Sequence, residues 1–303
     1  MLCCGFNSSW SQDHNWWANN VGWDGKAHWS TYIIYAPRHL GPNALPVPSL
    51  DDGRIENEHY FKTTMQTHVS KGDFTVNPFL HFTYALVPDV VSFDLFMVPA
   101  EYFIMSHEKR TERRTFHYVY GRQVAIGDVY FNTNFQLTRK RWDTRFRMGY
   151  RYASSNMVAL ARFTDMPGYY FDLNAARTVH EKDGNSLRLS AMLGMYVWQT
   201  NSDTRYQNDA LLFGLGVNYQ HGGWRTETHI RGYSGYLNNG DRPVVWKTEL
   251  SRVYKRLKVE FSYQMGLHDF AYHTLEIGAA YFLTKNTCQP KFGDNGQTLK
   301  TRN

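Results

Sequence analysis

KVEFSYQMGL, from Lys258 to Leu267, is the stretch of sequence that decides the fold. Every second residue of it is apolar or aromatic, namely Val259, Phe261, Tyr263, Met265 and Leu267. The residues between them are polar or small, namely Lys258, Glu260, Ser262, Gln264 and Gly266. Because successive side chains of a strand point to opposite sides, this pattern predicts a β-strand with one apolar and one polar face. The apolar face must contact either a protein core or lipid, and the rest of the chain decides between them.

The same alternation recurs along most of the chain from about residue 58. It predicts twelve strands, near residues 59–70, 74–86, 90–103, 123–137, 142–154, 169–180, 186–199, 209–220, 224–236, 243–253, 257–267 and 271–283. Most of them exceed the roughly five or six residues usual in soluble sheets. They match the roughly 9–11 residues that a tilted strand needs to cross a bilayer.

Composition points the same way. Hydrophobic residues make up 42% of the 303 residues, and no run approaches the roughly 18 apolar residues of a transmembrane helix, so a helical bundle is excluded. Aromatic residues reach 16%, which suits strands and the aromatic girdles of membrane barrels. The net charge is +6, but no helix-turn-helix, zinc-finger or RNA-binding signature accompanies it, so we predict no nucleic-acid partner.

The connections between the predicted strands give a second line of evidence. If both ends of the strand array face the periplasm, connections after even-numbered strands should be short. These connections are indeed tight, at residues 87–89, 138–141, 181–185, 221–223 and 254–256. Those after odd-numbered strands are mostly longer, near 104–122, 155–168, 200–208 and 237–242, although 71–73 and 268–270 are short. Pro78 and Pro99 fall inside predicted strands, where a missing N–H breaks a ladder bond, and predict bulges or shifted boundaries there.

Strand length, alternation and loop parity together resemble the Gram-negative outer-membrane β-barrels as a class. The resemblance covers residues 58–283 and rests on pattern, because the chain carries no specific family motif. It implies an all-β fold, an antiparallel transmembrane β-barrel of about 12 strands in a bacterial outer membrane. The apolar faces would then contact outer-membrane lipid, and the polar faces would line the lumen.

Three segments follow from this pattern. Residues 1–57 form an irregular N-terminal segment, rich in Trp and Pro, with a signal remnant expected at residues 1–12. Residues 13–57 are expected to serve either as a plug of the lumen or as an arm that docks a protein partner, because exposed Trp is costly. The barrel occupies residues 58–283, and residues 284–303 form a periplasmic tail. Cys3, Cys4 and Cys288 make neither a disulfide framework nor a zinc pair.

The polar faces supply the candidate functional residues. Assigned strand by strand to the lumen, the predicted pore-lining residues are Arg145, Arg147, Arg151, Arg188, Arg225, Glu227, His229, Arg231, Lys247, Glu249, Lys258, Glu260 and Glu276. In an open pore these charges would set which solutes enter, and the arginine fork suits carboxylate or phosphate. In a narrow lumen the same charges would instead pair into a salt-bridged core, and the sequence leaves both alternatives open.

A basic stretch in the longest predicted outer loop is a candidate contact for lipopolysaccharide. Lys109, Arg110, Arg113 and Arg114 could bind the phosphates of that leaflet by charge-assisted hydrogen bonds. The alternative is a solvated loop without a ligand.

The leading prediction is a porin-like outer-membrane channel for small polar or anionic solutes. The alternative is a closed barrel that acts as a structural or assembly subunit and binds a partner through its N-terminal segment. A second alternative is a lipid-modifying hydrolase, but no GxSxG or HExxH occurs, and His229 and Ser234 fall on opposite faces of their strand. His268, Asp269 and His273 could together ligate a metal, but their presence is explained equally well if they are polar residues at the membrane interface. We therefore predict no enzyme, no catalytic residue, no metal and no cofactor.

Overall fold

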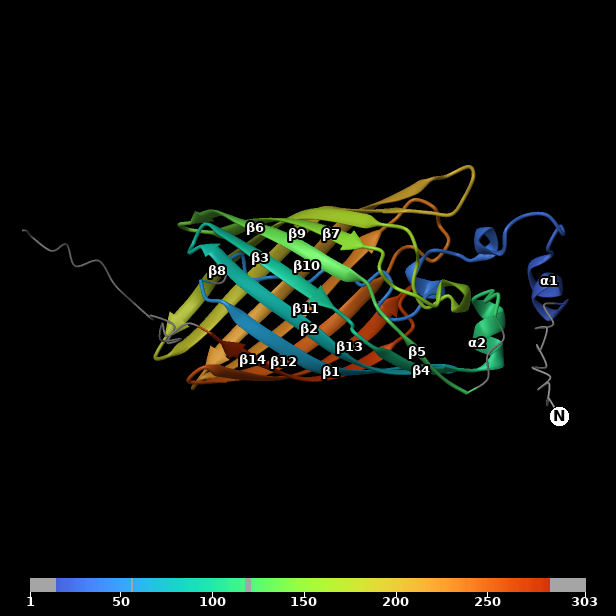
Figure 1. The fold of residues 1–303 in the computed structure, drawn as a ribbon. Coiled ribbons are helices and arrows are strands. Elements are labelled where there is room, and N and C mark those ends of the chain that lie inside the picture. Colours follow the sequence, from blue (N-terminus) through green and yellow to red (C-terminus); the bar gives the residue numbers. More distant parts are fainter. Residues whose placement is uncertain (1–14, 56, 118–120, 284–303) are drawn as a thin grey trace, which may run out of the picture.

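The computed structural model describes residues 15–55, 57–117 and 121–283, and they form a closed antiparallel β-barrel (Figure 1). Its elements in chain order are α1 (Asn15–Val21), η1 (Trp29–Tyr32), η2 (Pro37–His39), β1 (Tyr60–Ser70), β2 (Asp73–Val87), β3 (Val91–Met97), β4 (Glu101–Met105), α2 (His107–Glu112), β5 (Arg122–Ala125), β6 (Val129–Arg139), β7 (Asp143–Tyr152), η3 (Val158–Leu160), β8 (Gly168–Lys182), β9 (Asn185–Gln199), β10 (Gln207–His221), β11 (Trp224–Ser234), β12 (Val244–Tyr254), β13 (Leu257–His268) and β14 (His273–Phe282).

The barrel closes because β1 pairs with both β14 and β2. Every other strand pairs with its neighbours in the order β1-β14-β13-β12-β11-β10-β9-β8-β7-β6-β3-β2. Closure pairs each of these twelve strands on both sides, which is the condition for a sheet to span lipid. The twelve-stranded barrel predicted from alternation is confirmed, with β4 and β5 as two short additional strands.

The additional strands arise at the two prolines that conflict with the strand pattern. β2 pairs with β4 as far as Val76 and with β3 from Leu80 onward, so Pro78 lies where that side of β2 has no ladder partner. Pro99 lies in the facing interruption between β3 and β4. On its other side β2 stays in register with β1 through Pro78, so the predicted irregularity takes the form of a break in one ladder rather than a bulge.

The side-chain pattern of β13 shows what the apolar faces contact. Val259 and Phe261 are 42% and 48% exposed on the outside of the barrel, whereas Glu260 between them is only 5% exposed. Large apolar side chains are exposed in the same way on strands all round the barrel. A continuous apolar outer surface of this extent is a surface for lipid, so the barrel spans a membrane.

The two ends of the barrel differ as the loop parity predicted. Tight turns join β2 to β3, β6 to β7, β8 to β9, β10 to β11 and β12 to β13 at one end, here called the turn end. The longer connections, with α2 and η3, gather at the other end, here called the loop end (Figure 1, right). The short β1–β2 and β13–β14 connections are the exceptions that the sequence already shows. In the described part of the chain, no helix has the length and hydropathy of a transmembrane helix.

The N-terminal segment runs through the inside of the barrel. α1 lies over the loop end beside α2 (Figure 1), whereas β1 begins at Tyr60, paired with Phe282 at the turn end. Residues 15–41, here called the cap, cover the loop end, and residues 42–55, here called the lumen segment, cross the interior. The predicted signal remnant at 1–12, the tail at 284–303 and all three cysteines lie outside the described residues.

A hydrophobic core fills the loop-end half of the barrel. Tyr35, Leu40 and Leu45 of the N-terminal segment pack with Trp198 and Tyr233 of the barrel wall, and all of them are at most 2% exposed. Trp198 donates its indole N–H to the carbonyl oxygen of Tyr35 over 3.1 Å. The prediction that the inward faces are polar is therefore wrong for this half, because the cap supplies an apolar partner for aromatic inward-facing side chains.

The cap contacts the longer loops. Trp17 donates to the carbonyl oxygen of Arg114 over 3.0 Å, and Tyr35 donates its hydroxyl to Asp165 over 2.8 Å. Burial, with the carboxylate of Asp165 beside it, raises the pKa of the Tyr35 phenol, so this donor stays protonated. The backbone N–H of Arg38 bonds to the carbonyl oxygen of Gly240 over 3.2 Å. These contacts join the loops into one cover over the barrel.

Candidate functional site in the barrel lumen

The predicted pore-lining residues all point into the barrel, but the structure gives them different partners. Arg145 and Arg147 of β7, Arg188 of β9 and Arg225 of β11 contact the lumen segment. The charged residues of β12, β13 and β14 pair with one another. Arg151 is fully buried against Asp128 over 2.8 Å and does not border the cavity described below. Whether any of them lines a conducting pore stays a prediction.

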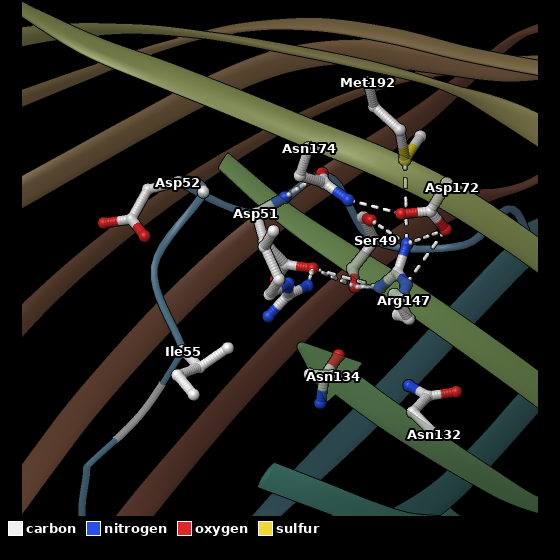
Figure 2. A network of polar contacts seen from close by, with 12 residues as sticks. Ser49, Asp51, Asp52, Ile55, Asn132, Asn134, Arg147, Asp172, Asn174 and Met192 are labelled. Carbon is white, nitrogen blue, oxygen red and sulfur yellow. Dashed lines mark hydrogen bonds and ion pairs between the residues drawn. The ribbon is translucent and has the colours of Figure 1, made fainter. Parts of the chain in front are cut away.

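Arg147 is the centre of the contacts between the wall and the lumen segment (Figure 2). Its guanidinium donates to Asp172 of β8 over 2.8 Å and to Asp51 of the lumen segment over 3.0 Å. It also donates to the hydroxyl and the carbonyl oxygen of Ser49, over 2.8 and 2.7 Å. Arg145 pairs with the same carboxylate of Asp51. The fork of Arg147 is therefore divided between the wall and the lumen segment, which fastens one to the other.

Asp52 and Arg54 extend this attachment toward the turn end. Arg188 donates to the carbonyl oxygen of Asp52 over 2.9 Å, and Arg225 pairs with the Asp52 carboxylate over 3.2 Å. Arg54 pairs with Asp143 of β7 over 2.8 Å, and Arg188 shares that carboxylate over 2.7 Å. These lumen-segment residues were not among the site residues predicted from the sequence. One sequence signal could have pointed to them. Asp51 and Asp52 are adjacent carboxylates in a segment predicted either to plug the lumen or to dock a partner, and one predicted strand carries several inward-facing arginines.

A second buried network seals the loop end. Arg162, in the loop between β7 and β8, pairs with Asp73 and with Glu101, each over 2.6 Å, and is 0% exposed. Its guanidinium lies 4.2 Å from the ring centroid of Phe103. Burial alone would lower the pKa of Arg162, but the carboxylates of Glu101 and Asp73 outweigh burial and raise it above its ordinary value. Arg162 therefore stays charged and joins the β7–β8 loop to β2 and β4 through its ion pairs.

The same carboxylates bind three further segments. Asp73 also accepts from Arg113 of the α2 loop and from the hydroxyl of Tyr272, each over 2.7 Å. Glu101 accepts from the amide of Asn43 in the lumen segment over 2.6 Å. Loops, strands and the lumen segment thus meet in one hydrogen-bonded cluster, and all of its named residues except Asn43 are at most 2% exposed.

The structure buries three of the four residues predicted to contact lipopolysaccharide, and the contact itself stays a prediction. Lys109, Arg110 and Arg113 are 7%, 3% and 1% exposed, because α2 folds back over the loop end of the barrel. Ser106 caps this helix, its hydroxyl accepting from the backbone N–H of Lys109 over 3.2 Å. Arg114 alone is exposed, and its contact with lipopolysaccharide stays a prediction.

A cavity of about 380 Å³ lies between the lumen segment and the wall. Its charged side is formed mainly by inward-facing residues of β11, β12 and β13. Across the barrel, an aromatic side is formed by Phe79 of β2, Phe96 of β3 and Tyr130 of β6. Phe96 and Tyr130 are stacked, with ring centroids 4.8 Å apart. These rings were not among the sequence-predicted site residues, which were chosen for their charge.

Most charges on the charged side are neutralised locally. Lys258 pairs with Glu249 over 3.0 Å and with Glu260 over 3.2 Å. Lys247 pairs with Glu276, which also accepts from the hydroxyl of Ser262 over 2.6 Å. The charges of the lumen are therefore largely paired, and a cavity is left beside them; whether this cavity belongs to an open pore stays a prediction.

Metal-binding groups do not converge in the described residues, where no cluster of three His, Cys, Asp or Glu could hold an ion. His268 bonds through Nδ1 to the carbonyl oxygen of Arg242, and His273 bonds through Nδ1 to the hydroxyl of Tyr263. What the lumen offers chemically is thus hydrogen bonding, charge and ring stacking.

No protein-family model and no curated protein sequence matches this chain. Among solved structures, an outer membrane channel from Pseudomonas putida F1 matches 78% of this chain and 100% of its own, with 10% sequence identity and a TM-score of 0.53. The NanC porin and the KdgM porin each match 73% of this chain and 98% of their own at 10% identity, with lower TM-scores of 0.46 and 0.44. The Pseudomonas match, at so low an identity, shows the fold alone: this chain has the fold of an outer-membrane β-barrel channel.

Proposed function

We propose that this chain is a porin-like channel of the bacterial outer membrane that passes small polar or anionic solutes, and that its lumen segment narrows the path. The observation that carries the proposal is the cavity of about 380 Å³ inside a barrel whose outer surface is apolar. The fold shared with an outer-membrane channel supports this location and this class of function. The function is passive, since it requires a path and a selective lining and no chemical step.

The lining supports a preference for anions. The wall arginines that contact the lumen segment are matched by Asp51 and Asp52, which are carboxylates of the chain itself. If the segment shifts, the wall presents guanidinium groups to the lumen, and these suit carboxylate and phosphate. In this proposal the lumen segment therefore occupies the positions that anionic solutes would use.

A second candidate function is a closed barrel that serves as a structural or assembly subunit. The sealed loop end favours it, because the cap and the Arg162 cluster fill that half of the interior. The exposed part of the cap would then be the contact for a protein partner, and Trp23, which is 44% exposed, is its most prominent apolar residue.

Planar-bilayer recording of the intact protein separates the two candidates. The channel proposal predicts discrete conductance steps above the background of detergent alone. It also predicts a reversal potential of the sign for anion preference in a KCl gradient. A silent protein, together with silence of the Asp51 and Asp52 variant described in the Discussion, would contradict the channel proposal and favour the closed barrel.

The orientation of the barrel makes a separate prediction. With Cys3, Cys4 and Cys288 replaced by Ser, Lys26→Cys in the cap and Arg141→Cys in the β6–β7 turn should lie on opposite sides of the membrane. Intact cells treated with a membrane-impermeant maleimide should label Cys at residue 26 and spare Cys at residue 141. Lysed cells should label both. Labelling of residue 141 but not of residue 26 on intact cells would show that the barrel has the opposite orientation in the membrane.

A further inference from the structure

Arg231 of β11 differs from the other basic residues of the cavity wall. It is 8% exposed and borders the cavity, and one guanidinium N–H donates to the side-chain oxygen of Gln264 over 3.1 Å. Its Nε has no hydrogen-bond partner. Within residues 15–55, 57–117 and 121–283, no carboxylate lies within ion-pair distance of it. A buried guanidinium with a single neutral partner is unfavourable and is stabilised by an anion that reaches it.

The nearby carboxylates are already committed to lysines. Glu249 accepts from Lys258 over 3.0 Å, and Glu276 pairs with Lys247 and accepts from Ser262. Moving Glu276 to Arg231 would leave Lys247 without its carboxylate, and moving Glu249 would leave Lys258 with Glu260 alone. The wall itself therefore does not supply the missing anion.

His229 lies two residues before Arg231 on the same face of β11 and borders the same cavity. Its Nε2 has no hydrogen-bond partner. At about 3.3 Å per residue, the two side chains leave the strand roughly 7 Å apart, so one small anion can reach both. On β10 the residues paired with Arg231 and His229 are Gly214 and Gly216, and side chains of Leu50, Ser190 and Met192 occupy the space over these glycines.

The aromatic side of the cavity faces these two residues. In the ring of strands, β12, β13, β14, β1 and β2 separate β11 from β3 in one direction, and β10, β9, β8, β7 and β6 separate them in the other. β3 therefore lies across the barrel from β11. Phe96 of β3 stacks on Tyr130, and the centroid of Phe79 lies 5.7 Å from that of Phe96. Aromatic rings on a cavity wall bind flat apolar groups through their faces and edges.

We propose that the cavity is a binding site for a small aromatic carboxylate, with the carboxylate on Arg231 and His229 and the ring against Phe79, Phe96 and Tyr130. The cavity of about 380 Å³ falls in the range of roughly 300–1,000 Å³ usual for small-molecule sites. A polar solute without a ring leaves the aromatic wall unused, and a neutral ring leaves the guanidinium unpaired. The inference deepens the proposed channel function by naming a solute class, but binding is measurable without conductance.

Isothermal titration of the detergent-solubilised protein with benzoate, acetate and benzyl alcohol tests the site. Benzoate should bind at least about tenfold more tightly than either of the other two, because only benzoate carries both groups. Arg231→Gln should weaken benzoate binding by about tenfold or more, since the charged hydrogen bond is lost. Arg205→Gln removes the same charge from an exposed loop and should leave binding unchanged.

Phe96→Leu provides a test that leaves the charges in place. It should weaken benzoate binding by roughly threefold to tenfold and leave acetate binding unchanged, because it removes only the ring contact. Equal affinity for benzoate and acetate would overturn the aromatic part of the inference. Benzoate binding that survives Arg231→Gln, or no benzoate binding to the intact protein, would overturn the site. Conductance without benzoate binding would overturn this inference alone, whereas benzoate binding by a silent barrel would contradict only the channel.

Discussion

Replacing Asp51 and Asp52 together by asparagine should raise the single-channel conductance of the reconstituted barrel by roughly threefold or more. Asp51 pairs with Arg145 and Arg147, and Asp52 pairs with Arg225, so the double variant removes the anions that hold the lumen segment on the wall. The wall arginines would then repel one another and attract anions from solution. The lumen should widen, and the reversal potential should move further toward anion preference.

Asp183→Asn with Asp203→Asn is the matched control, because it changes the net charge equally at two exposed loop positions. Its conductance should equal that of the intact protein. Heat-dependent gel mobility and circular dichroism should show that both variants remain folded barrels. A folded Asp51 and Asp52 variant with unchanged conductance would mean that the lumen segment does not limit the path.

Arg162→Met should lower the free energy of unfolding by about 3–5 kcal/mol, because it leaves the buried carboxylate of Glu101 without its cation and that of Asp73 with Arg113 alone. Arg162 is fully buried and pairs with both Asp73 and Glu101 over 2.6 Å. Arg205→Met in an exposed loop is the control and should change the free energy by less than about 0.5 kcal/mol. Urea titration in lipid vesicles, followed by Trp fluorescence, measures both.

The double variant Arg162→Met with Glu101→Leu sharpens this test. If the large loss comes from an unpaired buried carboxylate, removing Glu101 as well should restore part of the stability. A double variant that loses the sum of the two single losses would assign the effect to packing around Phe103 instead.

The strands could be predicted from sequence because each one lies between lipid and an interior. The outward residues of β13 had to be apolar, and their alternation with Lys258, Glu260 and Ser262 recorded that constraint locally. Loop parity added the direction of the array, and Pro78 and Pro99 marked the position where β3 and β4 part. These signals need only neighbouring residues, so one sequence suffices to read them.

The contents of the lumen could not be predicted in the same way. The contact between Asp51 and Arg147 joins residues 96 positions apart, and no periodicity in the proline-rich segment points to it. Alternation also predicts that Tyr196 and Trp198 face inward, but it does not predict what they contact inside the barrel. The structure shows that they pack in one core with apolar residues of the cap rather than facing water. Likewise, whether Arg231 has an ion-pair partner depends on all the side chains around it. These come from several strands, so the sequence of β11 alone does not reveal it.

The position of the N-terminal segment constrains how this barrel can assemble. The chain passes through the ring that its own β1 and β14 complete, so the segment either lies inside before these strands pair or enters the closed ring unfolded. Afterwards the cap, with α1, η1 and η2 at the loop end, is too bulky to follow the lumen segment through a filled interior. A pull on the chain from the turn end would therefore have to unfold these helices, one after another, before the segment could leave. Withdrawal in that direction is limited by the rate of local unfolding, which makes the cap a mechanical stop on the path of its own chain.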